Sequence, residues 1–397
     1  MIKDRYDVVV IGAGPAGSVA ARFAAENGAS VLILERDREP GVPVRCAEGV
    51  SHEGIKPFIE IDERWIATKI KTAGLHAPNG QNAVMYNNGD GYILERRIFD
   101  TELCNIACRK GANLLTKADA IGLVWENEKI VGVEYNHLNQ KKIVKCDIVI
   151  GADGVESQVG NWAGIDTSVK LADIDTCVQY TLTDIEIEDK ERCEFYFGTK
   201  VSPGGYIWIF PKGNNTANVG VGIAGSLAKD KGPKEYLDEF VAKHFPQASV
   251  NCIIYGGVPT SATLHEIVKD NLLLVGDAAR QVNPLTGGGI VQGMIAASIA
   301  GKVAAEAVQK ADFSKKFLKK YREQWDKRLG NKQKTMYKMK DKFMAMDDDR
   351  FNNLVGICQK IPKDKFSLKV LLREVVKGDP KMMMELAKAF VISKVKM

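Results

Sequence analysis

The chain has 397 residues, of which 45% are hydrophobic and 26% are charged, and its formal net charge is +5. This length exceeds what one hydrophobic core usually serves, so we expect two domains and an appendage. The apolar content supports a full globular core and excludes a disordered chain, and no internal repeat is evident. No recognition motif accompanies the positive charge, so we expect no nucleic acid partner.

The sequence predicts a cytoplasmic protein without a metal site. Its first strand follows the starting methionine closely, which leaves no room for a signal peptide. The longest apolar stretch, residues 290–308, is interrupted by polar and charged residues, which favours a buried helix over a membrane span. The eight cysteines lack zinc-ligand spacing, and the arrangement of Cys104 and Cys108 one helical turn apart is typical of packing.

A glycine-rich turn near the start is the first motif. The apolar strand 7–11 runs directly into the turn 12–17, whose sequence is GAGPAG, and an Ala-rich helix is predicted over 18–26. A second apolar strand, 31–34, ends at Glu35. Strand, glycines, helix, second strand and acid occur in the order of a dinucleotide-binding βαβ unit.

Each glycine of this turn has a separate physical role. Gly12 permits the tight turn, Gly14 lets the backbone approach a pyrophosphate, and Gly17 allows close packing of helix on strand. The free N–H groups and the positive dipole end of the helix attract phosphates. Glu35 is placed to accept a hydrogen bond from a ribose diol.

The segment from 50 to 165 combines a hairpin, a helix and strands. An Asn/Gly-rich stretch at 86–91 predicts the turn of an inserted hairpin, and a helix is predicted over 97–110. The buried strand 147–150 leads to a turn at Asp153-Gly154. Further strands are predicted near 113–115, 121–126 and 130–135.

From about 165 to 260 the pattern changes to alternating strands, which predicts an antiparallel sheet and a second domain. A helix over 233–245 is appended to it. The predicted strands of this sheet are 176–182, 194–197, 206–210 and 217–223.

A second cofactor motif begins where the chain returns to the first domain. The buried strand 272–275 places Asp277 at its carboxyl end, where α/β sheets bind ligands. Three glycines, 287–289, then open a long helix over 290–310, whose N-terminal dipole favours the negative charge of a reduced flavin. A nicotinamide enzyme needs only the first motif, so the pair points to FAD.

The C-terminal region is predicted to be helical, Met-rich and basic. Residues 301–345 contain fourteen Lys or Arg and five Asp or Glu. Residues 315–322 interleave lysines with apolar residues at helical spacing. This pattern fits a basic helix on an anionic membrane surface, a docking site for an acidic ferredoxin, or a solvated helix face.

These elements predict an α/β fold with a Rossmann-like FAD-binding domain, an inserted antiparallel substrate domain and a C-terminal helical region. The predicted boundaries are 1–165 with 265–310 for the FAD-binding domain, 166–264 for the substrate domain and 311–397 for the helical region.

The chain resembles the flavoprotein hydroxylase superfamily of p-hydroxybenzoate hydroxylase, through its glycine fingerprint, its Asp153-Gly154 turn, its Gly276-Asp277 pair and the intervening sheet. Residues 43–49 (PVRCAEG) and 205–211 (GYIWIFP) look like the two marker motifs of the geranylgeranyl reductase family. The archaeal digeranylgeranylglycerophospholipid reductases within that family resemble the chain over essentially its full length. The resemblance implies FAD-dependent saturation of isoprenoid double bonds in archaeal membrane lipids.

The resemblance also implies which residues contact FAD. Ala16 and Gly17 would contact the pyrophosphate, and Glu35 the adenosine ribose. The other implied contacts are Cys46, Ala47 and Gly49 near the flavin, Arg96, Ala120 near the adenine, Asp277, Gly289 and Ile290.

The marker motifs supply our candidate catalytic residues, Cys46, Tyr206 and Trp208. Cys46 lies in a Pro- and Gly-bounded loop and either positions the flavin ring, donates a proton, forms a redox-sensitive thiol or is a small apolar filler. Tyr206, Trp208 and Phe210 alternate along one strand and so share one face. That face is either an aromatic wall for a flavin or a long apolar chain, or part of a packed sheet core.

We hypothesise hydride transfer from reduced FAD to one carbon of an alkene, with a proton reaching the other carbon. The implied substrate is a geranylgeranyl phospholipid, and ferredoxin, a deazaflavin and NAD(P)H are all compatible electron donors. We expect peripheral association with the inner face of the cell membrane. The alternatives are an FAD-dependent monooxygenase acting on an aromatic or polyprenyl substrate, and a non-catalytic lipid carrier.

Overall fold

The structure, a computed structural model, describes residues 2–361 and contains two eight-stranded sheets. The first sheet comprises β1 (Arg5–Ile11), β2 (Val31–Leu34), β6 (Asn113–Leu115), β7 (Ala118–Glu126), β8 (Lys129–His137), β9 (Gln140–Gly151), β15 (Val268–Lys269) and β16 (Leu272–Leu274). The second comprises β3 (Gly49–Ser51), β4 (Ile66–His76), β5 (Asn82–Leu94), β10 (Asp175–Thr183), β11 (Arg192–Tyr196), β12 (Tyr206–Gly213), β13 (Thr216–Ala224) and β14 (Ser249–Val258). The helices are α1 (Pro15–Glu26), α2 (His52–Ile55), α3 (Arg96–Arg109), α4 (Gln158–Trp162), α5 (Pro233–His244), α6 (Ile290–Lys310), α7 (Lys315–Trp325), α8 (Asn331–Met344) and α9 (Asp348–Gln359).

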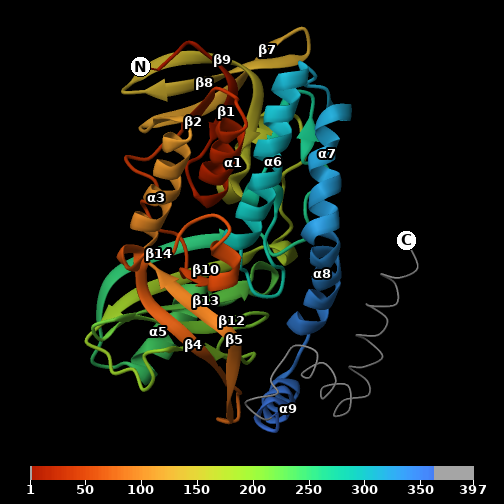
Figure 1. The fold of residues 1–397 in the computed structure, drawn as a ribbon. Coiled ribbons are helices and arrows are strands. Elements are labelled where there is room, and N and C mark those ends of the chain that lie inside the picture. Colours follow the sequence, from red (N-terminus) through yellow and green to blue (C-terminus); the bar gives the residue numbers. More distant parts are fainter. Residues whose placement is uncertain (1, 362–397) are drawn as a thin grey trace.

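The first sheet has a parallel centre, with neighbours in the order β16-β9-β1-β2-β6. Its central strands are continuous apolar runs that are buried, as expected for strands covered on both faces. Helices α1 and α6 pack side by side against this sheet (Figure 1). Their close approach depends on Gly301, where a Cβ would lie 2.3 Å from the carbonyl oxygen of Ala20.

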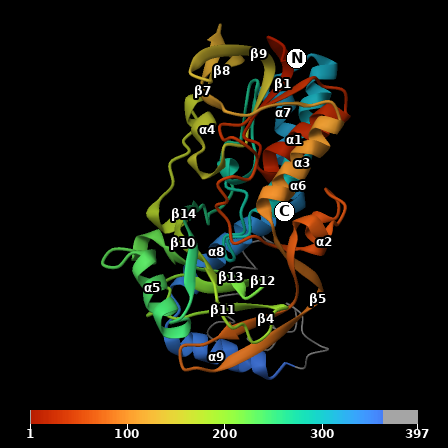
Figure 2. The same cartoon turned by 90° about the vertical axis from the view of Figure 1, so that its left-hand side faces the viewer.

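The second sheet lies beyond the carboxyl ends of these parallel strands (Figure 1), and its order is β14-β10-β13-β12-β11-β4-β5-β3. The antiparallel sheet predicted from residues 165–260 is confirmed, because all pairings among β10 to β14 are antiparallel. The sheet is extended by β4, β5 and β3, and β4 joins β11 in its one parallel pair. Helix α5 packs on β10 and β13, and α9 packs on β5 (Figure 2).

The predicted strands and helices are confirmed, with three corrections. The hairpin turn lies at residues 77–81 between β4 and β5, so the stretch predicted as the turn, 86–91, lies inside β5. Strand β14 was not predicted. Strands β3 to β5 belong to the second sheet, although the predicted boundaries assign them to the FAD-binding domain; those boundaries stay a prediction.

The C-terminal region is helical through α9, and the predicted helix around Met382–Met384 lies outside the described residues. Helix α7 buries its apolar residues Leu318, Tyr321 and Trp325 in the first core. Several of its basic residues form ion pairs, for example Lys320 with Glu306 at 2.8 Å. The solvated-face interpretation fits this helix best, because its apolar face is not free to enter a lipid surface.

Helix α6 is long and apolar enough to span a membrane by length and composition alone. More than half of its most apolar window is buried inside the molecule. The helix packs against α1 and α7, so the prediction of a buried core helix is confirmed.

Candidate active site

One cavity of about 1200 Å³ lies between the two sheets. It exceeds the usual range of small-ligand pockets, about 300–1000 Å³, so it has room for more than one ligand. The predicted site residues that line it are Gly14, Ala16, Cys46, Ala47, Gly49, Arg96, Tyr206, Trp208, Asp277, Gly289 and Ile290. Four predicted contacts, Gly12, Gly17, Glu35 and Ala120, are not among the lining residues.

The glycines of the turn 12–17 have two roles: Gly12 and Gly17 allow close packing, and Gly14 opens on the cavity. Gly12 has φ +100°, and a Cβ there would lie 2.4 Å from the carbonyl oxygen of Ala152. A Cβ at Gly17 would lie 1.9 Å from the carbonyl oxygen of Gly12. Nothing lies within 4 Å of a Cβ at Gly14, which opens on the cavity. The close packing expected of Gly17 and the open backbone expected of Gly14 are therefore both present.

Glu35 is buried behind this turn. Its carboxylate accepts hydrogen bonds from the backbone N–H groups of Ala13 at 2.7 Å and Asp37 at 2.9 Å. Burial raises the pKa of this carboxyl, and the two backbone donors oppose that effect. Strand β7 begins beside Glu35 through the bond from Ala118 N–H to its carbonyl, and Ala120 follows on the same strand. Their roles at the adenosine stay predictions.

Two helix N-termini face the same cavity. Gly14 and Gly289 are the N-cap residues of α1 and α6, and neither helix start is capped by a side chain. The free N–H groups and positive dipole ends of both helices therefore point to where anionic groups would bind. This arrangement fits FAD, which needs donors for its pyrophosphate and for the pyrimidine edge of its flavin.

Asp277 lies between the two helix starts. Its Oδ1 atom is 3.0 Å from a Cβ built at Gly289, and no described residue donates a hydrogen bond to its carboxylate. Burial raises the pKa of Asp277 to about 6, and the charge of Arg96 opposes the shift. An acceptor left open toward a cavity is suited to bind a ligand hydroxyl.

The raised pKa of Asp277 predicts a pH dependence of the apoprotein. The folded chain holds this proton more tightly than the unfolded chain, so the stability contribution is lost as pH rises through about 6. We expect Asp277→Asn to make the apoprotein more stable than wild type at neutral pH, and the gap to close in acid. FAD affinity should fall. Thermal unfolding measured across pH reports on the stability of the apoprotein, and titration with FAD reports on its affinity. Asp119→Asn, at an exposed position, is the control. Equal pH curves for Asp277→Asn and wild type would refute the raised pKa of Asp277.

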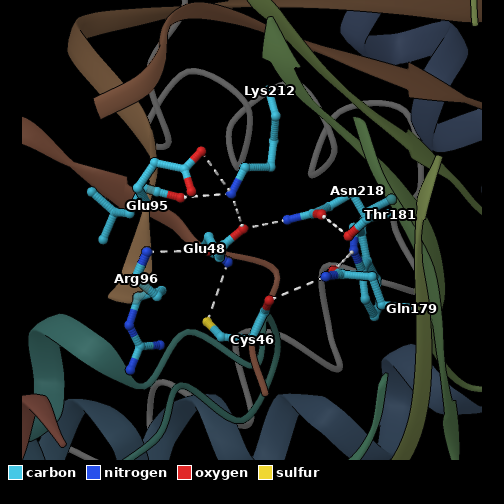
Figure 3. Close-up of polar contacts among 10 residues, drawn as sticks. Cys46, Glu48, Glu95, Arg96, Gln179, Thr181, Lys212 and Asn218 are labelled. Carbon is cyan, nitrogen blue, oxygen red and sulfur yellow. Dashed lines mark hydrogen bonds and ion pairs between the residues drawn. The ribbon is translucent and has the colours of Figure 1, made fainter. Parts of the chain in front are cut away.

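The loop at Cys46 is fixed by hydrogen bonds to the second sheet (Figure 3). The Cys46 Sγ accepts from the backbone N–H of Glu48 at 3.2 Å, and its carbonyl accepts from Gln179 Nε2 at 3.2 Å. Gln179 in turn accepts from Trp208 Nε1 at 2.9 Å. Burial raises the pKa of Cys46, which disfavours the thiolate that a redox-reactive cysteine requires.

The aromatic face predicted on β12 is confirmed. Tyr206, Trp208 and Phe210 line the cavity, whereas Ile207 and Ile209 belong to the core on the opposite face. The hydroxyl of Tyr206 donates to the carbonyl of Thr286 at 2.6 Å, which ties β12 to the loop before α6. The neighbouring Gly220 on β13 provides space for the indole, because a Cβ there would lie 2.3 Å from Trp208.

A buried ionic network behind the Cys46 loop was not predicted from the sequence (Figure 3). Glu48 accepts from Lys212 Nζ at 2.6 Å, from the side-chain amide of Asn218 and from the backbone N–H of Arg96 at 3.3 Å. The side chains of Glu48 and Lys212 are 4% and 12% exposed, so the pair is desolvated. The only available signals were the positions of Glu48 inside one marker motif and of Lys212 directly after the other.

Comparison with known proteins supports this geometry. The geranylgeranyl reductase catalytic domain family matches residues 173–258, and the FAD dependent oxidoreductase family matches residues 7–182. A digeranylgeranylglycerophospholipid reductase of Methanococcoides burtonii is 43% identical over 393 residues, which cover 98% of this chain and 96% of that protein.

Solved structures agree with the sequence comparison. A geranylgeranyl bacteriochlorophyll reductase-like protein from Thermoplasma acidophilum has a TM-score of 0.92 and 34% identity, with coverage of 97% of this chain and 99% of the other. A flavin-dependent brominase variant has a TM-score of 0.76 at 18% identity, covering 98% and 100% of the two chains, and shares the fold alone. The chain belongs to the digeranylgeranylglycerophospholipid reductase family of FAD-dependent oxidoreductases.

Proposed function

We propose that the protein uses FAD to saturate the double bonds of geranylgeranyl chains in a membrane phospholipid. The observation that carries this proposal is the single cavity that combines a cofactor cradle with an apolar compartment. The cradle is formed by the starts of α1 and α6 with Asp277. The apolar compartment is lined by Ile70, Leu75, Met85, Phe195, Phe197 and Phe343.

The apolar compartment suits an isoprenoid chain. Its side chains come from β4, β5 and β11 of the second sheet, from Phe197 directly after β11, and from α8, so the second sheet and the C-terminal region enclose it. Phe195 makes edge contacts with Tyr206 and Phe210, with ring centroids 5.5 and 5.6 Å apart. An aromatic and aliphatic lining excludes water and binds a hydrocarbon through burial of its apolar surface.

The chain's own residues would position the reactants. When bound and reduced, FAD supplies the hydride for the alkene. The Glu48 network and the bond from Gln179 hold the Cys46 loop in the wall of the cavity, and the same side-chain amide of Gln179 holds Trp208. We assign Cys46, Tyr206 and Trp208 to orienting the flavin and the alkene and to keeping the reaction dry.

We propose that the lipid enters from the cytoplasmic face of the membrane past β14, the edge strand of the second sheet. Val250, Ile253 and Tyr255 on this strand are exposed by 46%, 45% and 56%. Ile254 and Gly256 of the same strand line the cavity. An exposed apolar strand that continues into an apolar cavity fits a peripheral protein that draws a chain from a lipid surface.

Anaerobic stopped-flow spectroscopy tests the proposed function. We expect the reduced flavoprotein, mixed with vesicles of a geranylgeranyl phospholipid, to reoxidise without oxygen and to yield the saturated lipid by mass analysis. The fully saturated lipid is the matched control and should leave the flavin reduced. Oxygen-dependent hydroxylation would identify a monooxygenase instead, and absence of reoxidation would identify a carrier. Reduction by ferredoxin, a deazaflavin or NAD(P)H in parallel identifies the donor.

A further inference from the structure

Asp175 places a carboxyl group in the wall of the cavity. It is the first residue of β10, and the alternate residues Cys177 and Gln179 line the cavity with it. Strand β10 lies between β13 and the edge strand β14, so this polar row runs one strand in from the edge of the second sheet. Gln179 holds Trp208 and the Cys46 loop, whereas Asp175 has no part in the network around Glu48.

A chain of hydrogen bonds leads to Asp175 from α8. Lys340 is buried, and its ammonium group donates to the carbonyls of Ala172 at 2.6 Å and Thr260 at 2.8 Å and to the Thr260 hydroxyl at 2.8 Å. The Thr260 hydroxyl donates to Asp175 Oδ1 at 3.0 Å. Because all three ammonium protons have acceptors, the hydroxyl of Thr260 can only accept from Lys340 and donate to Asp175. The hydrogen bonds are therefore all oriented in one direction, from Lys340 through Thr260 to Asp175 in the cavity wall.

A second cavity, of about 390 Å³, lies near Ala172, which accepts from Lys340. Asp173 lines that cavity and accepts from the hydroxyl of Tyr337 at 2.6 Å. The ammonium of Lys340 also interacts electrostatically with both Asp173 and Asp175. Its hydrogen bonds go to Ala172 and Thr260, and only the bond to the Thr260 hydroxyl leads to the central cavity.

We propose that Asp175 supplies the proton that completes reduction of the alkene and that Thr260 and Lys340 return a proton to it. This inference rests on the proposed function. The π bond breaks as one carbon gains a hydride and the other forms a C–H bond with the carboxyl proton. Asp175 is left as a carboxylate and takes the hydroxyl proton of Thr260. Thr260 is reprotonated by Lys340, and a proton from solvent then restores Lys340.

Asp175 is better suited to this step than the thiol and phenol groups beside it. A carboxylic acid is a stronger acid than a thiol or a phenol, and burial raises the pKa of Asp175, which favours its protonated form; the charge of Lys340 opposes this shift. Burial also raises the pKa values of Cys177 and Tyr206, which face it, above their ordinary ranges. The proton of Tyr206 is already donated to Thr286.

Asp175→Asn tests the inference, because the amide keeps an oxygen for Thr260 and loses the acid. We expect normal stability, FAD content and flavin reduction, but product formation at least about 100-fold slower. Wild-type turnover should fall as pH rises through the pKa of Asp175, and the variant should lose this limb. Asp175→Glu should restore part of the rate, and Thr260→Val should slow turnover less than Asp175→Asn does. Asp238→Asn, which removes a carboxylate bonded to Tyr180 of the same strand, is the matched control.

Infrared spectroscopy supplies a readout that does not depend on activity. The difference between wild type and Asp175→Asn should contain the band of a protonated carboxyl that titrates with pH. A carboxylate at every pH, or a variant with the wild-type rate and pH profile, would overturn the inference. If wild type fails to reduce any geranylgeranyl lipid, the proposed function fails, and the infrared titration still reports on Asp175.

Discussion

Gly17→Ala is expected to yield a less stable protein that does not retain FAD. The added Cβ would lie 1.9 Å from the carbonyl oxygen of Gly12, and this contact is with backbone that cannot rotate away. Alanine gains about 1 kcal/mol of helix propensity over glycine, but overpacking of this kind costs about 1–3 kcal/mol or more. The clash therefore outweighs the propensity, and relief requires α1 to move away from β1. Chemical denaturation and the flavin absorbance of the purified protein measure the two effects.

Gly14→Ala is the matched control, because it separates cofactor binding from folding. A Cβ at Gly14 meets nothing within 4 Å and points to the cavity. Loss of glycine at this N-cap costs at most about 1 kcal/mol. We expect a folded apoprotein with near-normal stability and FAD affinity lowered by about 10-fold or more. Full FAD occupancy in Gly17→Ala would mean that this turn does not form the cofactor cradle.

Local sequence signals predicted most of the fold. Strand 31–34 and helix 290–310 occur at the predicted bounds, because each is an unbroken apolar run or a helical repeat with glycine at its start. Strand β14 was missed because it is an edge strand whose Val250, Ile253 and Tyr255 are exposed, so it lacks the alternation of a half-buried strand. The parallel pairing of β4 with β11 joins residues about 120 apart, and no local pattern encodes such a pairing.

The residues of the candidate site likewise fall into those that the sequence identified and those that it did not. The glycines and Asp277 belong to motifs whose spacing is set by local backbone geometry, and the sequence therefore identified them. The partners of Glu48 and Asp175 lie far away along the chain: Lys212 donates to Glu48, and Thr260, which accepts from Lys340, donates to Asp175. These residues acquire their chemistry from burial next to one another, which depends on sheet pairing and on the docking of α8.

Lys212→Met is expected to cost about 3–5 kcal/mol of unfolding free energy, because it leaves the carboxylate of Glu48 buried without its cationic partner. The remaining donors to Glu48, the amide of Asn218 and the backbone N–H of Arg96, are uncharged. The guanidinium of Arg96 also interacts electrostatically with Glu48, but its ion pair is with Asp100. The Cys46 loop should loosen with Glu48, so FAD retention should fall as well. Denaturant unfolding and flavin content of the purified variant test both results.

A double variant and an exposed pair make this prediction specific. Lys212→Met combined with Glu48→Gln removes the uncompensated charge, so it should recover most of the lost stability. Lys71→Met breaks an ion pair of similar length with Glu191, 2.9 Å, whose side chains are 60% and 51% exposed, and should change stability by less than about 1 kcal/mol. If the double variant is as unstable as Lys212→Met alone, the packing of the lysine stem, and not its charge, holds the Cys46 loop against β12.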